Sequence, residues 1–378
     1  ELLKEYPPCP ENIDPKLEWF SEYQLDVATK CGAIKSNGGY SATCKLTPRL
    51  YDKTNYVIHY RNLKFIVGLG AKVLKVHKVL TFNQKAWLKE YIDFNTQKRT
   101  QAKNDFEKDF FKLMNNAVFG KTMENVRNHV NIKIATSEEH AIKHFSKMTY
   151  KDSRHINGIY LVEHYHKEIV YNKPIYVGTP ILDLSKVCMM DYHYNVIEKS
   201  FHGKYNLNYS DTDSLVYSIQ CDDIYDWMNS NRQYFDLSET VRPDMHDNTN
   251  KKVIGKMKDE INGHLMLEFI ALNPKVYSIM HMGYNKAKQI ELQNKKACKG
   301  VSKVVVKKQI HHDDFKNLQN NTDPNAKPFT RTVTSIRSID HKTYTIKTDK
   351  IALTNMYDKM CMVDSNTCVP FGYIPPVA

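Results

Sequence analysis

Several features that would assign a sequence to a class at once are missing from this one. None of its apolar runs approaches the ~18 residues that a membrane-spanning helix needs, and the longest candidate, residues 65–74, is interrupted by Lys72. The opening residues have neither the basic region nor the apolar stretch of a secretory signal. The sequence therefore predicts no membrane partner.

Paired cysteines are missing too. The eight cysteines include no C-x-x-C pair, which argues against a zinc site and against a disulfide framework, so we expect a reducing, intracellular compartment. Only 14 glycines and 14 prolines occur among 378 residues, with 25% charged and 41% hydrophobic residues. That composition excludes a collagen-like or wholly disordered chain and predicts a buried core. The length predicts about two or three domains.

Positive charge is in surplus. The chain has 54 Lys and Arg against 42 Asp and Glu, a net charge of +12. Basic side chains bind polyanions because they release counterions condensed on the phosphates. The surplus is compatible with nucleic-acid binding but does not by itself predict it.

The pattern of apolar residues changes several times along the chain. Residues 1 to about 95 mix short apolar stretches with turn signals, and the alternation at 56–60 predicts a small strand-rich module. From Trp87 a helical period predicts two helices joined near residue 102. In the second helix Asn104 is the expected N-cap and Glu107 its capping-box partner.

The rest of the chain predicts mixed structure. Residues 126–175 are rich in His, Lys and Tyr and look like an insertion, and residues 180–199 predict a core helix. Two strands are expected around Asp211 and further strands through 265–282, followed by a lysine-rich module from about 286. The apolar stripe of the 180–199 helix consists of Ile181, Leu184, Val187, Cys188 and Met190.

One predicted helix has an unusual polar face. At ~100° per residue, Lys112, Asn116 and Phe119 share one side of the helix, so a cation, an amide and an aromatic ring lie one turn apart. Gly120 follows, where a missing side chain permits a close approach. A surface lysine, a surface amide and a C-cap glycine are the plain alternative. The opposite side, expected to face the core, carries Phe106, Phe110, Leu113 and Ala117, continued by Met114 and Val118.

Two carboxylates stand at a predicted turn. Asp211 and Asp213 lie in a D-T-D-S string between alternating strands. Because Asp and Ser are common in turns, an ordinary hairpin is one interpretation. Two carboxylates one residue apart repel each other, however, and a hard divalent cation such as Mg²⁺ removes that repulsion.

These strings resemble, in order and spacing, the motifs of family B DNA polymerases. Lys112-x-x-x-Asn116-x-x-Phe119-Gly120 resembles the signature of the fingers helix, with Phe in place of Tyr. The D-T-D-S string resembles motif C, and Lys275-Val-Tyr277 resembles the K-x-Y motif. The resemblance implies an α+β right-hand fold with an antiparallel-sheet palm, helical fingers and a thumb. It assigns residues 1–86 to the palm entry and an insertion-like module, 87–125 to the fingers, 126–175 to a second insertion, 176–285 to the palm and 286–378 to the thumb and C-terminal region.

The resemblance also implies roles for individual residues. Asp213 is the expected direct ligand of two catalytic Mg²⁺ ions, and Asp211 supports the same catalytic and metal site. The residues implied to bind the incoming nucleotide are Lys112, Asn116, Phe119, Gly120 and Arg99. The residues implied to contact DNA are Lys275, Tyr277, Lys108, Lys121 and Lys299, the last within a lysine-rich run over 295–308.

The implied function is that of a DNA-directed DNA polymerase. Such an enzyme adds deoxynucleotides to a primer 3′-hydroxyl with primer-template DNA and dNTPs as partners. The insertions resemble the protein-primed branch, which replicates viral or mobile-element genomes at a nuclear or viral replication site and uses a terminal protein as primer. The alternatives are a non-catalytic nucleic-acid-binding remnant and a two-metal nuclease, although a nuclease would not explain the face with Lys112.

One family motif is missing. No D-x-x-S-L-Y string, which carries the other metal-ligating aspartate, occurs in the sequence, and Asp183 begins only a weak likeness on the wrong side of the fingers helix. The chain begins with Glu1 in what the pattern predicts to be the middle of a domain. We therefore expect a fragment without motif A and without an exonuclease domain, inactive by itself.

Other short sequence patterns are weaker indications of a functional site. Asp105 and Glu107 have the D-x-E spacing of an exonuclease site, but acidic residues at a helix N-terminus are expected for structural reasons. The pair His140 and His144 lacks the glutamate of a zinc-protease motif. His164 and His166 are expected to share one face of a strand, and Gly68-Leu-Gly70 lacks the third glycine of a dinucleotide site.

Overall fold

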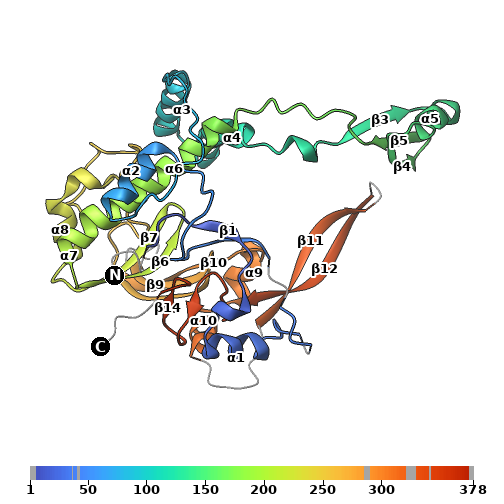
Figure 1. Ribbon diagram of the computed structural model, residues 1–378. Coiled ribbons are helices and arrows are strands. Elements are labelled where there is room, and N and C mark those ends of the chain that lie inside the picture. The colour runs from blue at the N-terminus through green and yellow to red at the C-terminus, as the bar shows by residue number, and fades with distance from the viewer. Residues whose placement is uncertain are drawn as a thin grey trace. The chain divides into compact units, whose positions relative to one another are not determined.

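The computed structural model describes residues 6–35, 37–40, 43–284, 290–320, 329–339 and 342–373. The chain divides into two compact units, of which the first comprises 1–80, 183–333 and 348–378 and the second 81–182 and 334–347 (Figure 1). Helices and antiparallel strand pairs are mixed in both, as an α+β chain requires. Among the described residues no helix is long and apolar enough to cross a membrane.

The first unit contains a three-stranded sheet and a separate hairpin. The sheet has the order β10-β9-β8, and the hairpin pairs β6 with β7. The strands predicted around Asp211 and through 265–282 are thereby confirmed. The bounds are β6 (Tyr205–Asp211), β7 (Ser214–Ile219), β8 (Met266–Asn273), β9 (Val276–Tyr284) and β10 (Ile290–Cys298).

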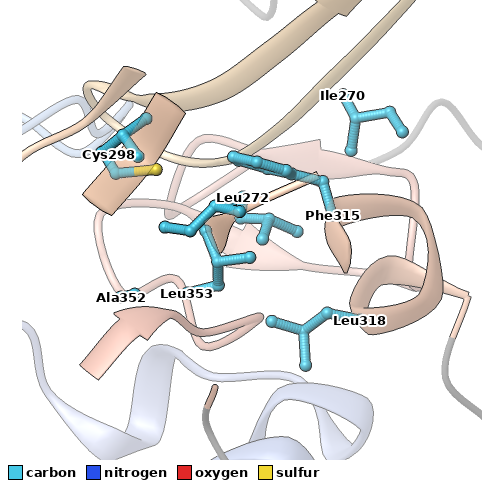
Figure 2. Close-up of a cluster of buried hydrophobic side chains, with 9 residues drawn as sticks. Ile270, Leu272, Cys298, Phe315, Leu318, Ala352 and Leu353 are labelled. Carbon is cyan, nitrogen blue, oxygen red and sulfur yellow. The ribbon is translucent and has the colours of Figure 1, made fainter. Parts of the chain in front are cut away.

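The main core of the first unit lies where two helices meet the sheet. Ile310 and Phe315 are fully buried there, and Leu272 packs against them from β8 (Figure 2). The lysine-rich module therefore folds into this core through its apolar residues. The elements are α9 (Lys303–Gln309), α10 (His312–Gln319), β11 (Phe329–Ile339) and β12 (Lys342–Leu353), the last two only outside 334–347, a range that belongs to the second unit.

Helix α10 is also attached to the sheet by polar contacts. His312 is buried and forms two hydrogen bonds, one with Ser278 Oγ at 2.8 Å and one with Glu268 at 3.1 Å. Lys316 forms an ion pair with the same Glu268 at 2.8 Å. These contacts fix the rotation of the helix because buried polar groups need partners.

The N-terminal part of the first unit is less strand-rich than the sequence predicts. The alternation at 56–60 does not form a strand. Instead His59 caps α2, which starts at Tyr60, because the imidazole Nδ1 accepts a hydrogen bond from the Arg61 N–H. Earlier in this N-terminal part, the buried side chain of Gln24 donates hydrogen bonds to the carbonyls of Tyr357 and Met360. The elements here are β1 (Glu11–Ile13), η2 (Leu17–Trp19), α1 (Glu22–Lys30), β2 (Lys45–Thr47), α2 (Tyr60–Gly68), β13 (Cys361–Met362) and β14 (Cys368–Val369).

The helix predicted at 180–199 is longer than expected and is only partly buried. It runs as α6 (Ile175–Asp191), a π-helical segment (Tyr192–Ile197) and α7 (Glu198–Phe201). Met190 is buried, whereas Ile181 and Leu184 are exposed. The prediction of a core helix is therefore correct for its second half and wrong for its first.

The stretch at 222–250 forms a small core of its own. It includes α8 (Ile224–Ser230) and the single turn η5 (Arg232–Tyr234). Met245 is fully buried, and Trp227 packs edge-on against Phe235. This part contacts the start of the π-helical segment, since Tyr192 packs against the same Phe235.

The second unit contains the two predicted helices, α3 (Lys89–Gln101) and α4 (Asp105–Thr122). Asn104 caps α4 as predicted, because its side-chain oxygen accepts the Glu107 N–H at 2.9 Å. The Glu107 carboxylate in turn accepts the N–H of Lys103, the residue before the cap, at 3.0 Å. The acidic residues at this helix start therefore serve the cap.

The predicted core face of α4 is wrong for most of its residues, although Met114 and Val118, which continue the predicted stripe, are half-buried. Phe106 is 78% exposed, and Phe110 and Leu113 are exposed as well. The packed face lies about a quarter-turn away or more. There the Met114 carbonyl accepts the Tyr91 hydroxyl at 3.4 Å, and the Asn115 side chain donates to Thr96 at 3.3 Å.

The insertion at 126–175 folds into a small sheet with one helix. Its strand order is β3-β5-β4. Two histidines meet in its core, His144 of α5 and His164 of β5, with ring nitrogens 3.1 Å apart. His166 lies beyond the strand and is exposed, so the two residues do not share a strand face. The elements are η3 (Val126–Asn128), β3 (Asn131–Ala135), α5 (Glu138–Phe145), β4 (Tyr150–Ile156) and β5 (Ile159–His164).

Candidate functional site

The two carboxylates lie at the tip of the β6–β7 hairpin. Asp211 pairs with Ser214, so Thr212 and Asp213 form a two-residue turn. Thr212 has a φ of +53°, a conformation that β-branched residues rarely adopt. The Asp213 N–H donates to the Asp211 carbonyl at 2.5 Å. The backbone of the turn therefore holds the two aspartates together.

A second strained turn meets the first. Pro274 and Lys275 join β8 to β9, and Lys275 has a φ of +63°. Its N–H donates to the Tyr209 hydroxyl at 2.8 Å, and its Nζ lies 2.6 Å from Asp211 Oδ2. The main chain and the side chain of Lys275 thus contact two residues of the same strand, β6.

An aromatic cluster supports the junction of the two hairpins. Tyr277 follows Lys275 on β9 and packs against Tyr209 with ring centroids 5.5 Å apart. Phe269 of β8 lies 5.7 Å from Tyr209 and 5.9 Å from Tyr277. Tyr277 therefore has a packing role, and this packing holds the start of β9 next to Lys275.

Positive charge surrounds the two carboxylates. The ion pair with Asp211 raises the pKa of Lys275, and Asp213 adds to the effect. Burial is the main cause that lowers the pKa of Lys359, with Lys45 and Lys299 acting in the same direction and Asp211 opposing them. The Lys299 N–H donates to the Lys275 carbonyl at 3.1 Å. The site therefore combines two acidic groups with several cations.

The carboxylates fit a magnesium ion that has further oxygen ligands. Mg²⁺ keeps several waters and usually takes one or two carboxylates together with substrate phosphates. Asp211 and Asp213 supply such a pair, and no cluster of three or more His, Cys, Asp or Glu occurs among the described residues. Asp211 would have to exchange its contact with Lys275 for one with the metal.

The predicted nucleotide-binding residues lie on α4 in the second unit. Lys112 and Asn116 are exposed one turn apart, and Phe119 is half-buried beside them. Gly120 is exposed, has no positive φ, and a Cβ there would meet nothing within 4 Å. The fold of this unit does not require a glycine at this position.

The remaining predicted cations of the second unit have different surroundings. Arg99 is half-buried on α3, and Lys108 lies 4.0 Å from Asp105. Lys121 forms an ion pair with Glu124 at 2.8 Å, and Lys173 contacts the same carboxylate at 2.9 Å. Those hydrogen bonds, that of Lys121 first, lower the pKa of Glu124 to about 2.

Lys121 also borders a groove of about 460 Å³ along α4. The groove is mostly apolar and is bordered by residues of α3, α4 and the segment before α6. Its other lining residues are Tyr91, Met114, Ala117, Val118, Thr122, Asn172, Lys173 and Pro174.

The structure groups the predicted residues into two sets. Asp211, Asp213, Lys275, Tyr277 and Lys299 gather in the first unit. The predicted nucleotide-binding residues, with Lys108 and Lys121, belong to the second.

Sequence reasoning missed Tyr209, Lys45 and Lys359. Tyr209 stands two residues before Asp211, on the same strand face, so the strand period could have identified it. Lys359 lies 146 residues after Asp213 in a segment without regular structure, and no pattern pointed to it.

Comparisons with family models, with curated proteins and with solved structures found no match.

Proposed function

We propose that this chain contributes the metal-binding and nucleotide-binding residues of a DNA-directed DNA polymerase, an enzyme that carries out nucleotidyl transfer. The observation that supports the proposal most is the contact between the two hairpins. Lys275 and Asp211 are 64 residues apart in sequence, yet an ion pair joins the K-x-Y string to the D-T-D-S string. Beside it, the Lys275 N–H donates a hydrogen bond to the hydroxyl of Tyr209, two residues before Asp211. Two independent motifs of the same family resemblance thus meet at one place.

The chemistry of the proposed step is an in-line displacement at phosphorus. The primer 3′-oxygen forms a bond to the α-phosphorus of a dNTP, its proton passes to water, and the bond to the bridging oxygen breaks to release pyrophosphate. Bound Mg²⁺ would supply charge stabilisation for the attacking and leaving oxygens. Asp213 and Asp211 would hold the metal, and Lys275 and Lys299 would bind primer phosphates.

The exposed face of α4 fits the triphosphate. Lys112 would contact phosphate oxygens as a point charge, and Asn116 would donate a hydrogen bond one turn further along. Phe119 would pack against the sugar or the base. The proposal includes primer-template DNA and dNTPs as partners and replication of a viral or mobile-element genome, with protein priming suggested by the insertion at 126–175.

One observation favours a second candidate, a non-catalytic nucleic-acid-binding protein. The Asp211 carboxylate is held by Lys275 at 2.6 Å, and a cation that occupies this oxygen competes with a metal for it. In this candidate the acidic turn only positions Lys275, and the lysines around it bind phosphate.

Primer extension with the complete gene product separates the two candidates. With Mg²⁺ and four dNTPs we expect extension by the unmodified protein and none by Asp213→Asn, while DNA binding is retained. The matched control is Asp222→Asn, since Asp222 is an exposed carboxylate just after β7. Extension that survives in Asp213→Asn would disprove the metal site, and DNA binding without extension in every version would support the second candidate.

A further inference from the structure

An unusual segment follows helix α2 in the first unit. Residues 72–80 belong to no helix or strand, and every one of them is exposed. Five of these nine residues are large and apolar. They are Val73 (49% exposed), Leu74 (84%), Val76 (63%), Val79 (69%) and Leu80 (73%).

The main chain of this segment is unpaired as well. Within the part of the chain that the structure describes, no main-chain hydrogen bond to another main-chain group involves residues 72–80. Valine and leucine side chains are typical of buried strands, and exposed strand edges attract other strands. The segment has the composition of a strand without the neighbours of one.

The charges of the segment are regular. Its sequence is a triplet repeated three times, Lys-Val-Leu, Lys-Val-His and Lys-Val-Leu, so Lys72, Lys75 and Lys78 recur at every third position. Among the described residues none of these lysines forms an ion pair with an acidic side chain. Residues 53–89 contain no acidic residue, and their basic residues are Lys53, Arg61, Lys64, Lys72, Lys75, Lys78, Lys85 and Lys89.

We propose that residues 72–80 are a docking strand for another protein, which pairs with it through an extended segment carrying acidic residues at every third position and apolar residues between them. Such a partner would satisfy the main-chain groups, cover the valines and leucines, and place a carboxylate opposite each lysine. The proposal is independent of the proposed function, because it uses none of the residues of the carboxylate turn or of α4.

Two other occupants fit less well. A second copy of this chain would bring three more lysines to a site that already has three, and like charges across a strand pair are unfavourable. A nucleic acid would contact the lysines through its phosphates but would leave the apolar side chains in water. The combination of aliphatic and basic residues therefore favours an acidic, apolar polypeptide.

The test uses synthetic nonapeptides and the full chain. The probe EVVEVVEVV is compared with KVVKVVKVV, which has the opposite charge, and with EEEVVVVVV, which has the same composition without the spacing. We expect the first to bind at least about tenfold more tightly than either control in fluorescence anisotropy. Bound probe should also slow hydrogen exchange of the amides of residues 72–80.

Two variants place the binding on the segment. Val76→Pro removes one main-chain donor in a stretch that has no internal hydrogen bonds, so the fold is retained while peptide affinity falls about fivefold or more. Replacing Lys72, Lys75 and Lys78 together by Glu should reverse the preference toward KVVKVVKVV. Equal binding of all peptides, or exchange protection confined to other residues, would overturn the proposal. Protection of this segment by an oligonucleotide alone, or self-association that protects it, would replace the acidic strand by that occupant.

Discussion

In the proposed metal site, Lys275 and a metal ion would compete for one carboxylate oxygen of Asp211. The Nζ atom of Lys275 lies 2.6 Å from Asp211 Oδ2, and the lysine side chain is about half exposed. Ion pairs with an exposed partner contribute only ~0.2–1 kcal/mol, because water screens them. The contact is thus weak enough to be exchanged for a metal ligand and strong enough to measure.

Replacing Lys275 by methionine should therefore strengthen divalent-cation binding. We expect the affinity for Mn²⁺, used as a spectroscopic substitute for Mg²⁺, to rise by up to about fivefold in Lys275→Met, the size of one exposed ion pair. A Mn²⁺ titration followed by electron paramagnetic resonance measures it. Lys308→Met, at an exposed lysine of α9, is the matched control and should bind Mn²⁺ as the unmodified chain does. Weaker Mn²⁺ binding in Lys275→Met would show that the ion pair organises the site.

Thr212 is strained where a glycine would not be. A β-branched residue at a φ of +53° is disfavoured by ~1–2 kcal/mol, whereas glycine adopts the conformation freely. Because glycine also loses more chain entropy, Thr212→Gly should stabilise the first unit by about 1 kcal/mol or less in urea unfolding. Asn157→Gly in the β4–β5 turn is the comparison, since asparagine tolerates its φ of +49° and little gain is expected. A loss of stability in Thr212→Gly would mean that the threonine hydroxyl contributes more than the strain removes.

Among the elements, helix α4 depends on its cap. Asn104 accepts the N–H of Glu107 in the first turn, and Glu107 accepts the N–H of Lys103, the residue before the cap. We expect Asn104→Ala to lower the free energy of unfolding of the second unit by about 1 kcal/mol, measured by urea unfolding. Asn104→Ser preserves a capping acceptor without placing a carboxylate against Glu107, whose Oε1 accepts the Asn104 amide at 3.0 Å, and should remain within a few tenths of a kcal/mol. An equal loss of unfolding free energy in both variants would show that the cap does not stabilise the helix.

The π-helical segment contains the clearest pH-sensitive group. His193 is fully buried, and burial lowers its pKa to about 4, with Glu198 partly opposing the change. Its Nδ1 lies 2.9 Å from the Tyr217 hydroxyl of β7. In the folded chain the imidazole is therefore neutral over a range in which the unfolded chain binds a proton.

The sign of the pH dependence follows directly. Above the unfolded pKa of ~6.5 the contribution of His193 to stability is fully present. It is lost as the pH falls toward 4, and the total loss at pH 4 is about 3 kcal/mol. Urea unfolding at pH 7, 6 and 5 should show a declining free energy of unfolding in the unmodified chain. Between pH 7 and 5 the decline should be smaller by about 2 kcal/mol in His193→Gln, which stays neutral. The same slope in both proteins would assign the pH dependence to other groups, such as His144, whose pKa is lowered by burial.

At the scale of the whole molecule, net charge sets the response to salt. The chain carries +12, and three of its lysines, Lys275, Lys299 and Lys359, gather near the carboxylate turn. If these three lysines bind phosphates, the logarithm of the binding constant for duplex DNA should fall with the logarithm of the salt concentration with a slope of about −2.7. The affinity should then fall about fortyfold between 50 and 200 mM salt. Fluorescence anisotropy at several salt concentrations measures the slope. A slope near zero would contradict phosphate binding at this site.

The sequence predicted local structure better than packing. Alternation around Asp211 and the cap at Asn104 are short-range features, and both are found in the structure. The predicted core face of α4 was wrong except at its margin with Met114 and Val118, because the most apolar side of a helix was assumed to be buried. In the structure the side with Met114 and Asn115 contacts α3, which leaves Phe106 exposed.

The candidate site could be predicted only in part for a similar reason. Asp211, Asp213 and Lys275 could be found because each belongs to a short string with chemical meaning. Their contact partners come from far along the chain, as Lys359 does, and a sequence pattern does not record which distant segments meet. At 56–60 the alternation predicted a strand, but the histidine that caps α2 decided the local structure.

The contact between Lys275 and Asp211 has a thermodynamic consequence. If a primer phosphate attracts Lys275 away from Asp211, the freed carboxylate binds a metal ion more tightly. By reciprocity, a bound metal then strengthens the binding of the primer by the same factor. The two ligands would then be positively cooperative at equilibrium. A single lysine at a strained turn would make the metal site complete mainly when the nucleic acid is present.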